Sequence, residues 1–160
     1  RHSNSSTGPR LADPTGPKML LDANLLIYAV DETLPEHQRA STWLTDQLNG
    51  DRRIGLPWES LTAFLRITTH PRATTRPLQP ADAWRYVLDW LAVDLVWTPV
   101  ATERHADVLA GLLERYRIAG NLVPDAHLVA LAIEHGLEVC SADTDFARFT
   151  EVRWRNPLAD

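Results

Sequence analysis

The chain has 160 residues, 44% of them apolar and 23% charged, and its formal net charge is −5. This length and composition are typical of one globular domain with a substantial core. No apolar run is long enough to span a membrane, and the acidic balance argues against broad capture of nucleic acid by a basic surface.

Residues 1–18 differ in composition from the rest of the chain. They are rich in Ser, Pro, Gly and Thr and contain almost nothing to bury, and the single Met of the chain, Met19, follows them directly. We expect residues 1–18 to be an expression leader, with a native disordered arm as the alternative. Residues 19–160 are then expected to form one domain.

Short apolar runs alternate with longer segments of helical periodicity. The runs predicted as strands are residues 18–23, 52–57, 94–99, 137–142 and 151–157. The segments predicted as helices are residues 24–32, 34–50, 58–70, 80–92, 102–120 and 123–136, with a turn or short helix over 143–149. For the helix over 102–120, Thr102 is the expected cap and Gly120 the expected stop. This alternation predicts an α/β domain whose parallel sheet carries helices on both faces.

Cys140 is the only cysteine, and it lies in the apolar run "LEVCSA". One cysteine cannot form an intramolecular disulfide, so nothing favours an oxidising compartment. We expect a buried, inert thiol in a cytoplasmic protein.

Acidic residues follow three of the predicted strands. Asp22 ends the first strand, Glu59 follows the second, and Asp143 follows the fourth, with Asp145 two residues further on; Asp125 opens a helix. Taken alone, each is a common helix cap or first-turn residue. Ligand sites of parallel sheets, however, form beyond the carboxyl ends of the strands, where these residues are expected to meet.

Such a group of carboxylates needs compensation. Two carboxylates about 5 Å apart repel by about 3 kcal/mol at an effective dielectric constant of 20. A hard divalent cation such as Mg²⁺ or Mn²⁺, which prefers oxygen ligands, is the expected compensator. The six histidines are scattered and show no H-x-x-x-H spacing, so no zinc site is predicted.

Three segments, in this order and in this strand context, resemble PIN-domain nucleases. They are "MLLDANLLIYAVDE" at 19–32, "LPWESLTAFLRITTHPR" at 56–72 and "LVPDAHLVALAIEHGLEVCSADTDFARF" at 122–149. The length of the chain and the segment "RITTHPR" look most like VapC-type toxins of bacterial toxin–antitoxin pairs.

The resemblance implies a single PIN-like domain, a parallel β-sheet flanked by α-helices, that cleaves RNA with Mg²⁺ or Mn²⁺. The positions that correspond to the family's acidic quartet, and so to its catalytic metal ligands, are Asp22, Glu59, Asp125 and Asp143. Asp145 corresponds to a supporting ligand. Asn24 and Ser141 correspond to polar residues that orient the carboxylates or a water molecule.

The resemblance also implies partners. A toxin of this kind would have a cognate VapB-type antitoxin that places a basic side chain in the acidic pocket, and a homodimer is usual. The RNA substrate, whether transfer, ribosomal or messenger RNA, stays open, and its cleavage would inhibit translation and growth. No membrane partner is expected.

Three other classes of function compete with this interpretation. A haloacid-dehalogenase-type phosphatase also uses Mg²⁺ and an Asp after its first strand, but it needs a second Asp where this chain has Asn24. A non-catalytic PIN-like binding module has no reason to keep a full set of repelling carboxylates. A phospho-receiver domain needs a late Lys, whereas the only Lys is Lys18.

The substrate surface is predicted less sharply. Arg66, Arg72 and Arg76 lie around the loop after the Glu59 helix and could contact phosphates, or form a solvated basic stretch. Trp58 and Trp97 could stack on bases. Because most Trp residues in a domain of this size are buried, a core position is the favoured expectation for both.

Overall fold

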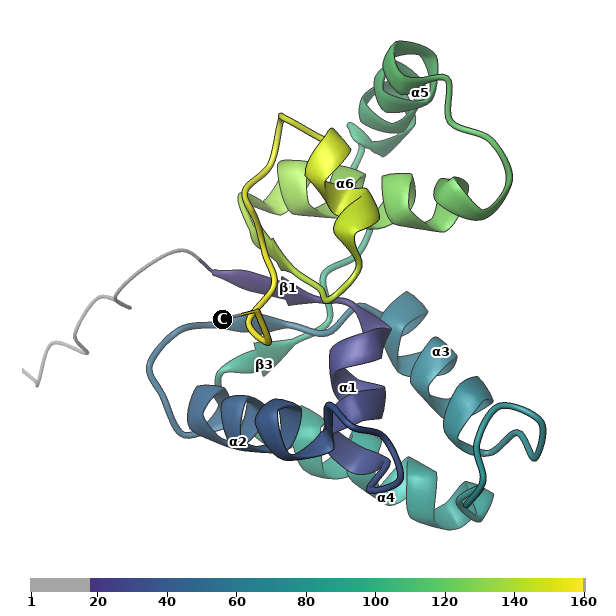
Figure 1. Cartoon of the computed structure of the whole chain (residues 1–160). Coiled ribbons are helices and arrows are strands. Elements are labelled where there is room, and N and C mark those ends of the chain that lie inside the picture. The colour runs from purple at the N-terminus through teal and green to yellow at the C-terminus, as the bar shows by residue number, and fades with distance from the viewer. Residues whose placement is uncertain (1–17, 160) are drawn as a thin grey trace, which may run out of the picture.

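Five parallel strands form the central sheet of the computed structural model, which describes residues 18–159 (Figure 1). The expected leader therefore falls almost wholly outside the described residues. The strands are β1 (Met19–Leu21), β2 (Ile54–Gly55), β3 (Val96–Trp97), β4 (Glu138–Cys140) and β5 (Trp154–Arg155). They lie in the order β3-β2-β1-β4-β5, and every pair is parallel. All five predicted strands are present.

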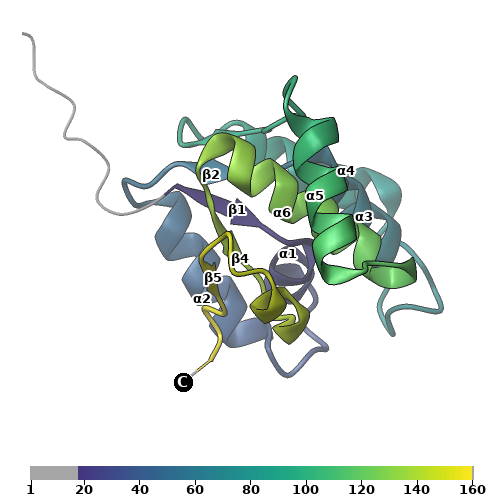
Figure 2. The same cartoon turned by 90° about the horizontal axis from the view of Figure 1, so that it is seen from above.

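Helices cover both faces of this sheet, as predicted. The helices are α1 (Ala23–Val30), α2 (His37–Leu48), α3 (Trp58–Thr68), α4 (Pro80–Leu91), α5 (His105–Tyr116) and α6 (Val123–His135), with short 3₁₀ helices η1 (Gly120–Leu122) and η2 (Thr144–Arg148). Helices α1 to α4 lie on one side of the sheet and the pair α5 and α6 on the other (Figures 1 and 2). No helix in the described part combines the length and apolar composition that a membrane crossing requires.

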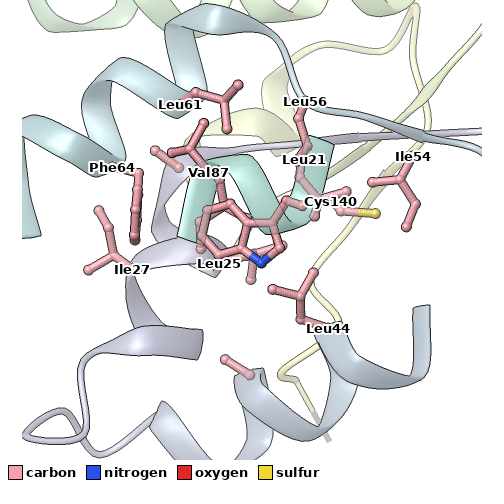
Figure 3. Packing of buried hydrophobic residues seen from close by; sticks show 14 of the residues in the cluster. Leu21, Leu25, Ile27, Leu44, Ile54, Leu56, Leu61, Phe64, Val87 and Cys140 are labelled. Carbon is pink, nitrogen blue, oxygen red and sulfur yellow. The ribbon is translucent and has the colours of Figure 1, made fainter. Parts of the chain in front are cut away.

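Strand β1 divides the core into two clusters because successive side chains of a strand point to opposite faces. Met19 and Leu21 belong to the cluster under α1 to α4, whereas Leu20 belongs to the cluster under α5 and α6. Cys140 lies fully buried in the first cluster, close to Leu21 (Figure 3). Burial raises the pKa of its thiol to about 12, with the charge of Glu138 adding to the effect, as expected for an inert cysteine.

Helix α5 is shorter at both ends than the predicted 102–120. The hydroxyl of Thr102 accepts a bond from the N–H of Arg104 and donates to Glu134, so the chain makes a local turn before the helix begins at His105. At the other end Arg117 adopts the left-handed conformation, with φ at 51°. The N–H of Ile118 then bonds to the carbonyl of Leu113, which closes the helix before the expected stop at Gly120.

The direction of chain growth reverses between β1 and β4. From β1 the chain builds outward through β2 and β3, and it then returns to add β4 and β5 on the other side. The backbone N–H of Asp22 donates to the carbonyl of Cys140 at 3.0 Å, so the carboxyl ends of the two strands are joined. In open parallel sheets this reversal is the place where ligands bind.

Candidate functional site

Three carboxylates meet at the reversal between β1 and β4. Asp125 in the first turn of α6, Asp143 after β4 and Asp145 in η2 each place one oxygen within 4.8 Å of the others. We call these three residues the acid group. The side chain of Asp143 also accepts a bond from the N–H of Asp145 at 2.8 Å and so caps η2. Asp143 therefore both caps η2 and belongs to the acid group.

Asp22 lies beside the acid group and is held by neighbouring polar side chains. It caps α1 by accepting a bond from the N–H of Ala23, and it accepts a bond of 2.7 Å from the hydroxyl of Ser141. The amide of Asn24 donates to the same hydroxyl at 3.1 Å. Ser141 itself is fully buried and also accepts from the N–H of Asp143 at 3.0 Å. This network fixes the ends of β1 and β4 relative to each other.

Negative charge accumulates at this edge of the sheet. Burial, followed by the charges of Asp22, Asp143 and Asp145, raises the pKa of Asp125 to about 6. Burial also raises the pKa of Asp22, against the hydrogen bonds from Ser141 and Ala23 that favour its ionised form. The guanidinium of Arg148, 3.6 Å from Asp145, offsets part of the repulsion. An added cation would relieve what remains.

Glu59 stands apart from the acid group, although the same pocket reaches it. A pocket of about 350 Å³ is lined by Glu59, Asp22, Asp125 and His127, with apolar side chains of α5 and α6. The carboxylate of Glu59 is 48% exposed and bonds to Nε2 of His127 at 2.9 Å. Three residues of the expected quartet, Asp22, Glu59 and Asp125, thus line one pocket. Asp143, the fourth, lies with Asp125 in the acid group, which Asp22 and Glu59 do not join.

Two features around these carboxylates are not predicted from the sequence. The histidines are scattered along the sequence, whereas in the structure Nε2 of His105 lies 3.0 Å from Nδ1 of His127. Arg148, which has no predicted role, contacts Asp145 from the same short helix. The one available signal was the position of His127 two residues after Asp125. The contact with His105 depends on how α5 packs on α6, which local spacing does not report.

The surface beside the pocket differs from expectation at one tryptophan. Trp58 is 41% exposed and stacks on the equally exposed Trp84, with ring centroids 6.3 Å apart, so it is not a core residue. Trp97 is partly buried, and the guanidinium of Arg53 lies 4.3 Å from its ring centroid. The three arginines named above as possible phosphate contacts are all exposed.

Comparisons with known proteins agree with this architecture. The PIN domain family matches residues 19–152. Ribonuclease VapC33 of Mycobacterium tuberculosis is 45% identical over 139 residues, which cover 87% of this chain and 97% of that protein.

Two solved structures share the fold at low sequence identity. The structure of VapBC-1 from nontypeable Haemophilus influenzae superposes with a TM-score of 0.61 at 14% identity and covers 88% of this chain and 98% of that one. A toxin–antitoxin complex from Klebsiella pneumoniae gives a TM-score of 0.57 at 17% identity, with the same coverage of both chains. The chain therefore belongs to the PIN-domain family and, within it, to the VapC ribonucleases.

Proposed function

We propose that this protein is a metal-dependent endoribonuclease that acts as the toxin of a toxin–antitoxin pair. Membership of the VapC ribonucleases supports RNA as the substrate class. The observation that carries the metal dependence is the acid group, whose three carboxylate oxygens lie within 4.8 Å of one another. No phosphatase-type second Asp stands two residues after Asp22, since Asn24 occupies that position and bonds to Ser141.

The residues at the pocket fit a hard divalent cation. The donors are all carboxylate oxygens, which Mg²⁺ and Mn²⁺ prefer. After burial, the charges of Asp22, Asp143 and Asp145 are the next causes of the raised pKa of Asp125, and a cation would offset them. Asp125, Asp143 and Asp145 would hold the ion, with Asp22 adjacent. When bound, such an ion activates a water molecule and stabilises charge on the phosphate and the leaving oxygen.

The other polar side chains at this edge of the sheet have distinct tasks in this proposal. Ser141 and Asn24 keep the carboxylate of Asp22 oriented. Glu59, half-exposed on the wall of the pocket, or Asp125 orients the attacking water or takes its proton. Hydrolysis in this way leaves a 5′-phosphate on one product and a 3′-hydroxyl on the other.

The proposal includes a restraining partner. The solved neighbour from Klebsiella pneumoniae is a toxin–antitoxin complex, and the pocket here is acidic and open at Glu59. A VapB-type antitoxin that inserts an Arg would satisfy the same carboxylates through charge-assisted hydrogen bonds. Toxin that is not bound by its antitoxin would then inhibit translation and growth. We also expect this protein to form a homodimer.

The test is cleavage of total bacterial RNA by the purified chain with Mg²⁺, with Mn²⁺ and with EDTA. We expect cuts only with a divalent ion, and loss of cleavage with retained fold for Asp22→Asn and Asp143→Asn. Hydrolysis of a small phosphate ester is measured in parallel. Activity on the ester without RNA cleavage, or undiminished RNA cleavage by both variants, would overturn the proposal.

A further inference from the structure

Four polar side chains form a continuous hydrogen-bonded series that ends at Glu59. Nδ1 of His105 lies 2.6 Å from Oε2 of Glu134, and Nε2 of the same ring lies 3.0 Å from Nδ1 of His127. Nε2 of His127 completes the series at 2.9 Å from Oε1 of Glu59. The series thus joins three helices, α3, α5 and α6, through side chains alone.

Helix geometry explains how the series is built. His127 and Glu134 are seven residues apart on α6, which is two turns, so both side chains lie on one face of the helix. His105, the first residue of α5, places its ring between them. The two imidazole rings meet edge to face, with centroids 4.8 Å apart and an interplanar angle of 76°.

The far end of the series is a fixed anchor. The side chain of Glu134 has no exposed surface, and it accepts bonds from both the N–H and the hydroxyl of Thr102, at 2.9 and 2.7 Å. Burial alone would raise the pKa of Glu134, but the hydrogen bonds from Thr102 and His105 outweigh it and hold the pKa below its usual value. Glu134 is therefore a stable ionised acceptor.

Exposure increases along the series toward the pocket. The side-chain exposure is 0% at Glu134, 15% at His105, 26% at His127 and 48% at Glu59. A half-exposed glutamate with three rotatable side-chain bonds has several rotamers to choose from, and each costs little in water. A bond to a ring that is itself held from behind removes that freedom.

The bonding pattern also defines the direction of the hydrogen bonds. A carboxylate only accepts hydrogen bonds, so both ends of the series must receive an N–H from an imidazole. Nδ1 of His105 therefore donates to Glu134, and Nε2 of His127 donates to Glu59. Both nitrogens that face the carboxylates are thus committed, and neither ring can turn without losing a bond. The 3.0 Å contact between Nε2 of His105 and Nδ1 of His127 is then a hydrogen bond only when one of the two rings carries a proton on both nitrogens.

We propose that Glu134, His105 and His127 form a positioning chain that fixes the carboxylate of Glu59 on the wall of the pocket. Glu59 then serves the reaction from outside the acid group, as the residue that orients the attacking water or the RNA. This inference rests on the proposed nuclease function for its role, although not for its geometry. If these hydrogen-bonded side chains only held the three helices in place, they would stabilise the fold without acting through Glu59.

The test uses His105→Ala, which removes the middle ring of the positioning chain and touches neither Glu59 nor the acid group. We expect kcat for a defined RNA to fall about 10- to 100-fold, as is usual for the loss of a supporting partner. KM and Mn²⁺ affinity are expected to stay within about twofold, and added imidazole to restore part of kcat. His37→Gln is the control. It removes a histidine ring at the start of the distant helix α2, where the ring is hydrogen-bonded to the carbonyl of Tyr28.

Combination with Glu59→Gln separates positioning from structure. If the positioning chain acts through Glu59, His105→Ala has no further effect on kcat in the Glu59→Gln background. An equal loss of kcat in both backgrounds, or a lowered melting temperature with unchanged kcat, would overturn the inference.

A second readout does not need catalysis. In the wild-type protein we expect the ¹⁵N and ¹H signals of the His127 ring to show that its Nε2–H is hydrogen-bonded. This hydrogen-bonded signal is expected to be lost in His105→Ala and kept in His37→Gln. Unchanged His127 signals in His105→Ala would contradict the positioning chain even if the protein cleaves no RNA. Absence of RNA cleavage by the wild-type chain would instead count against the proposed function.

Discussion

The hydroxyl of Ser141 donates a hydrogen bond of 2.7 Å to the carboxylate of Asp22, although 119 positions separate the two residues in the chain. The bond joins the ends of β1 and β4, the two neighbouring strands between which the direction of chain growth reverses. It keeps a largely buried carboxylate oriented beside three others, so it links the stability of the fold to the chemistry of the pocket.

Ser141→Ala should therefore affect both properties. The substitution removes the hydrogen bond to the buried carboxylate of Asp22, which is worth about 1.5–3 kcal/mol, together with the two bonds that the hydroxyl accepts from Asn24 and Asp143. We expect a free energy of unfolding lower by about that amount and slower RNA cleavage. Urea denaturation and cleavage assays measure the two effects, with Ser141→Thr, which keeps the hydroxyl, as the control. Equal stability of Ser141→Ala and the wild type would contradict the importance of this bond.

The pKa of Asp125, raised from 3.8 to about 6, gives the stability of the metal-free protein a defined pH dependence. Because the folded protein favours the protonated form, this residue contributes most stability below pH 4, and the contribution is lost as the pH rises through 6. Solvent screening of a partly exposed group limits the effect to about 1 kcal/mol.

Melting temperatures measured with EDTA between pH 4 and 7 test this dependence. We expect the Asp125→Asn variant to lack the part of the decline that the wild type shows over this range. Parallel curves for the two proteins would show that Asp125 ionises normally. Added Mg²⁺ should stabilise the wild type more at pH 7 than at pH 4, where protons compete with the ion for the carboxylates.

Metal binding should depend on the acid group and not on acidic residues in general. We expect Mn²⁺ to raise the melting temperature of the wild type and to have little effect on Asp143→Asn, which loses one charged ligand. Asp46→Asn, on the exposed face of α2, is the control and should respond like the wild type. A full response of Asp143→Asn to Mn²⁺ would place the ion elsewhere.

Trp58 offers a test of how RNA is held. It is exposed, stacks on Trp84 and directly precedes Glu59, so a base can stack beside the pocket. Loss of one stacking platform is worth about 1–3 kcal/mol per base. We expect Trp58→Ala to raise KM for single-stranded RNA by about tenfold or more while kcat changes little. A lower kcat at constant KM would point to a different role.

Much of the architecture follows from local pattern. The apolar run that ends at Asp22 and the longer helical segments between the short strands identify a parallel sheet with helices on both faces. The carboxyl ends of such strands share an edge, so Asp22 and Asp143 could be expected near each other before any coordinates. The resemblance in three segments then supplied the family, which the comparisons confirm.

What could not be predicted depends on contacts between distant elements. The left-handed conformation of Arg117, which ends α5, occurs at a residue that rarely adopts it. The exposure of Trp58 depends on how α4 packs beside α3. The contact between His105 and His127 joins two helices at positions that carry no recognisable spacing. The last two features lie beside the pocket, which Glu59 and His127 line.

The most direct test of the central claim is a crystal structure with Mn²⁺, in which anomalous scattering locates the ion. We expect a strong anomalous peak bound by carboxylate oxygens of Asp125, Asp143 and Asp145, with Asp22 held beside it by Ser141. A peak bound to other residues, or these three carboxylates without an ion at a Mn²⁺ concentration that supports RNA cleavage, would contradict the account.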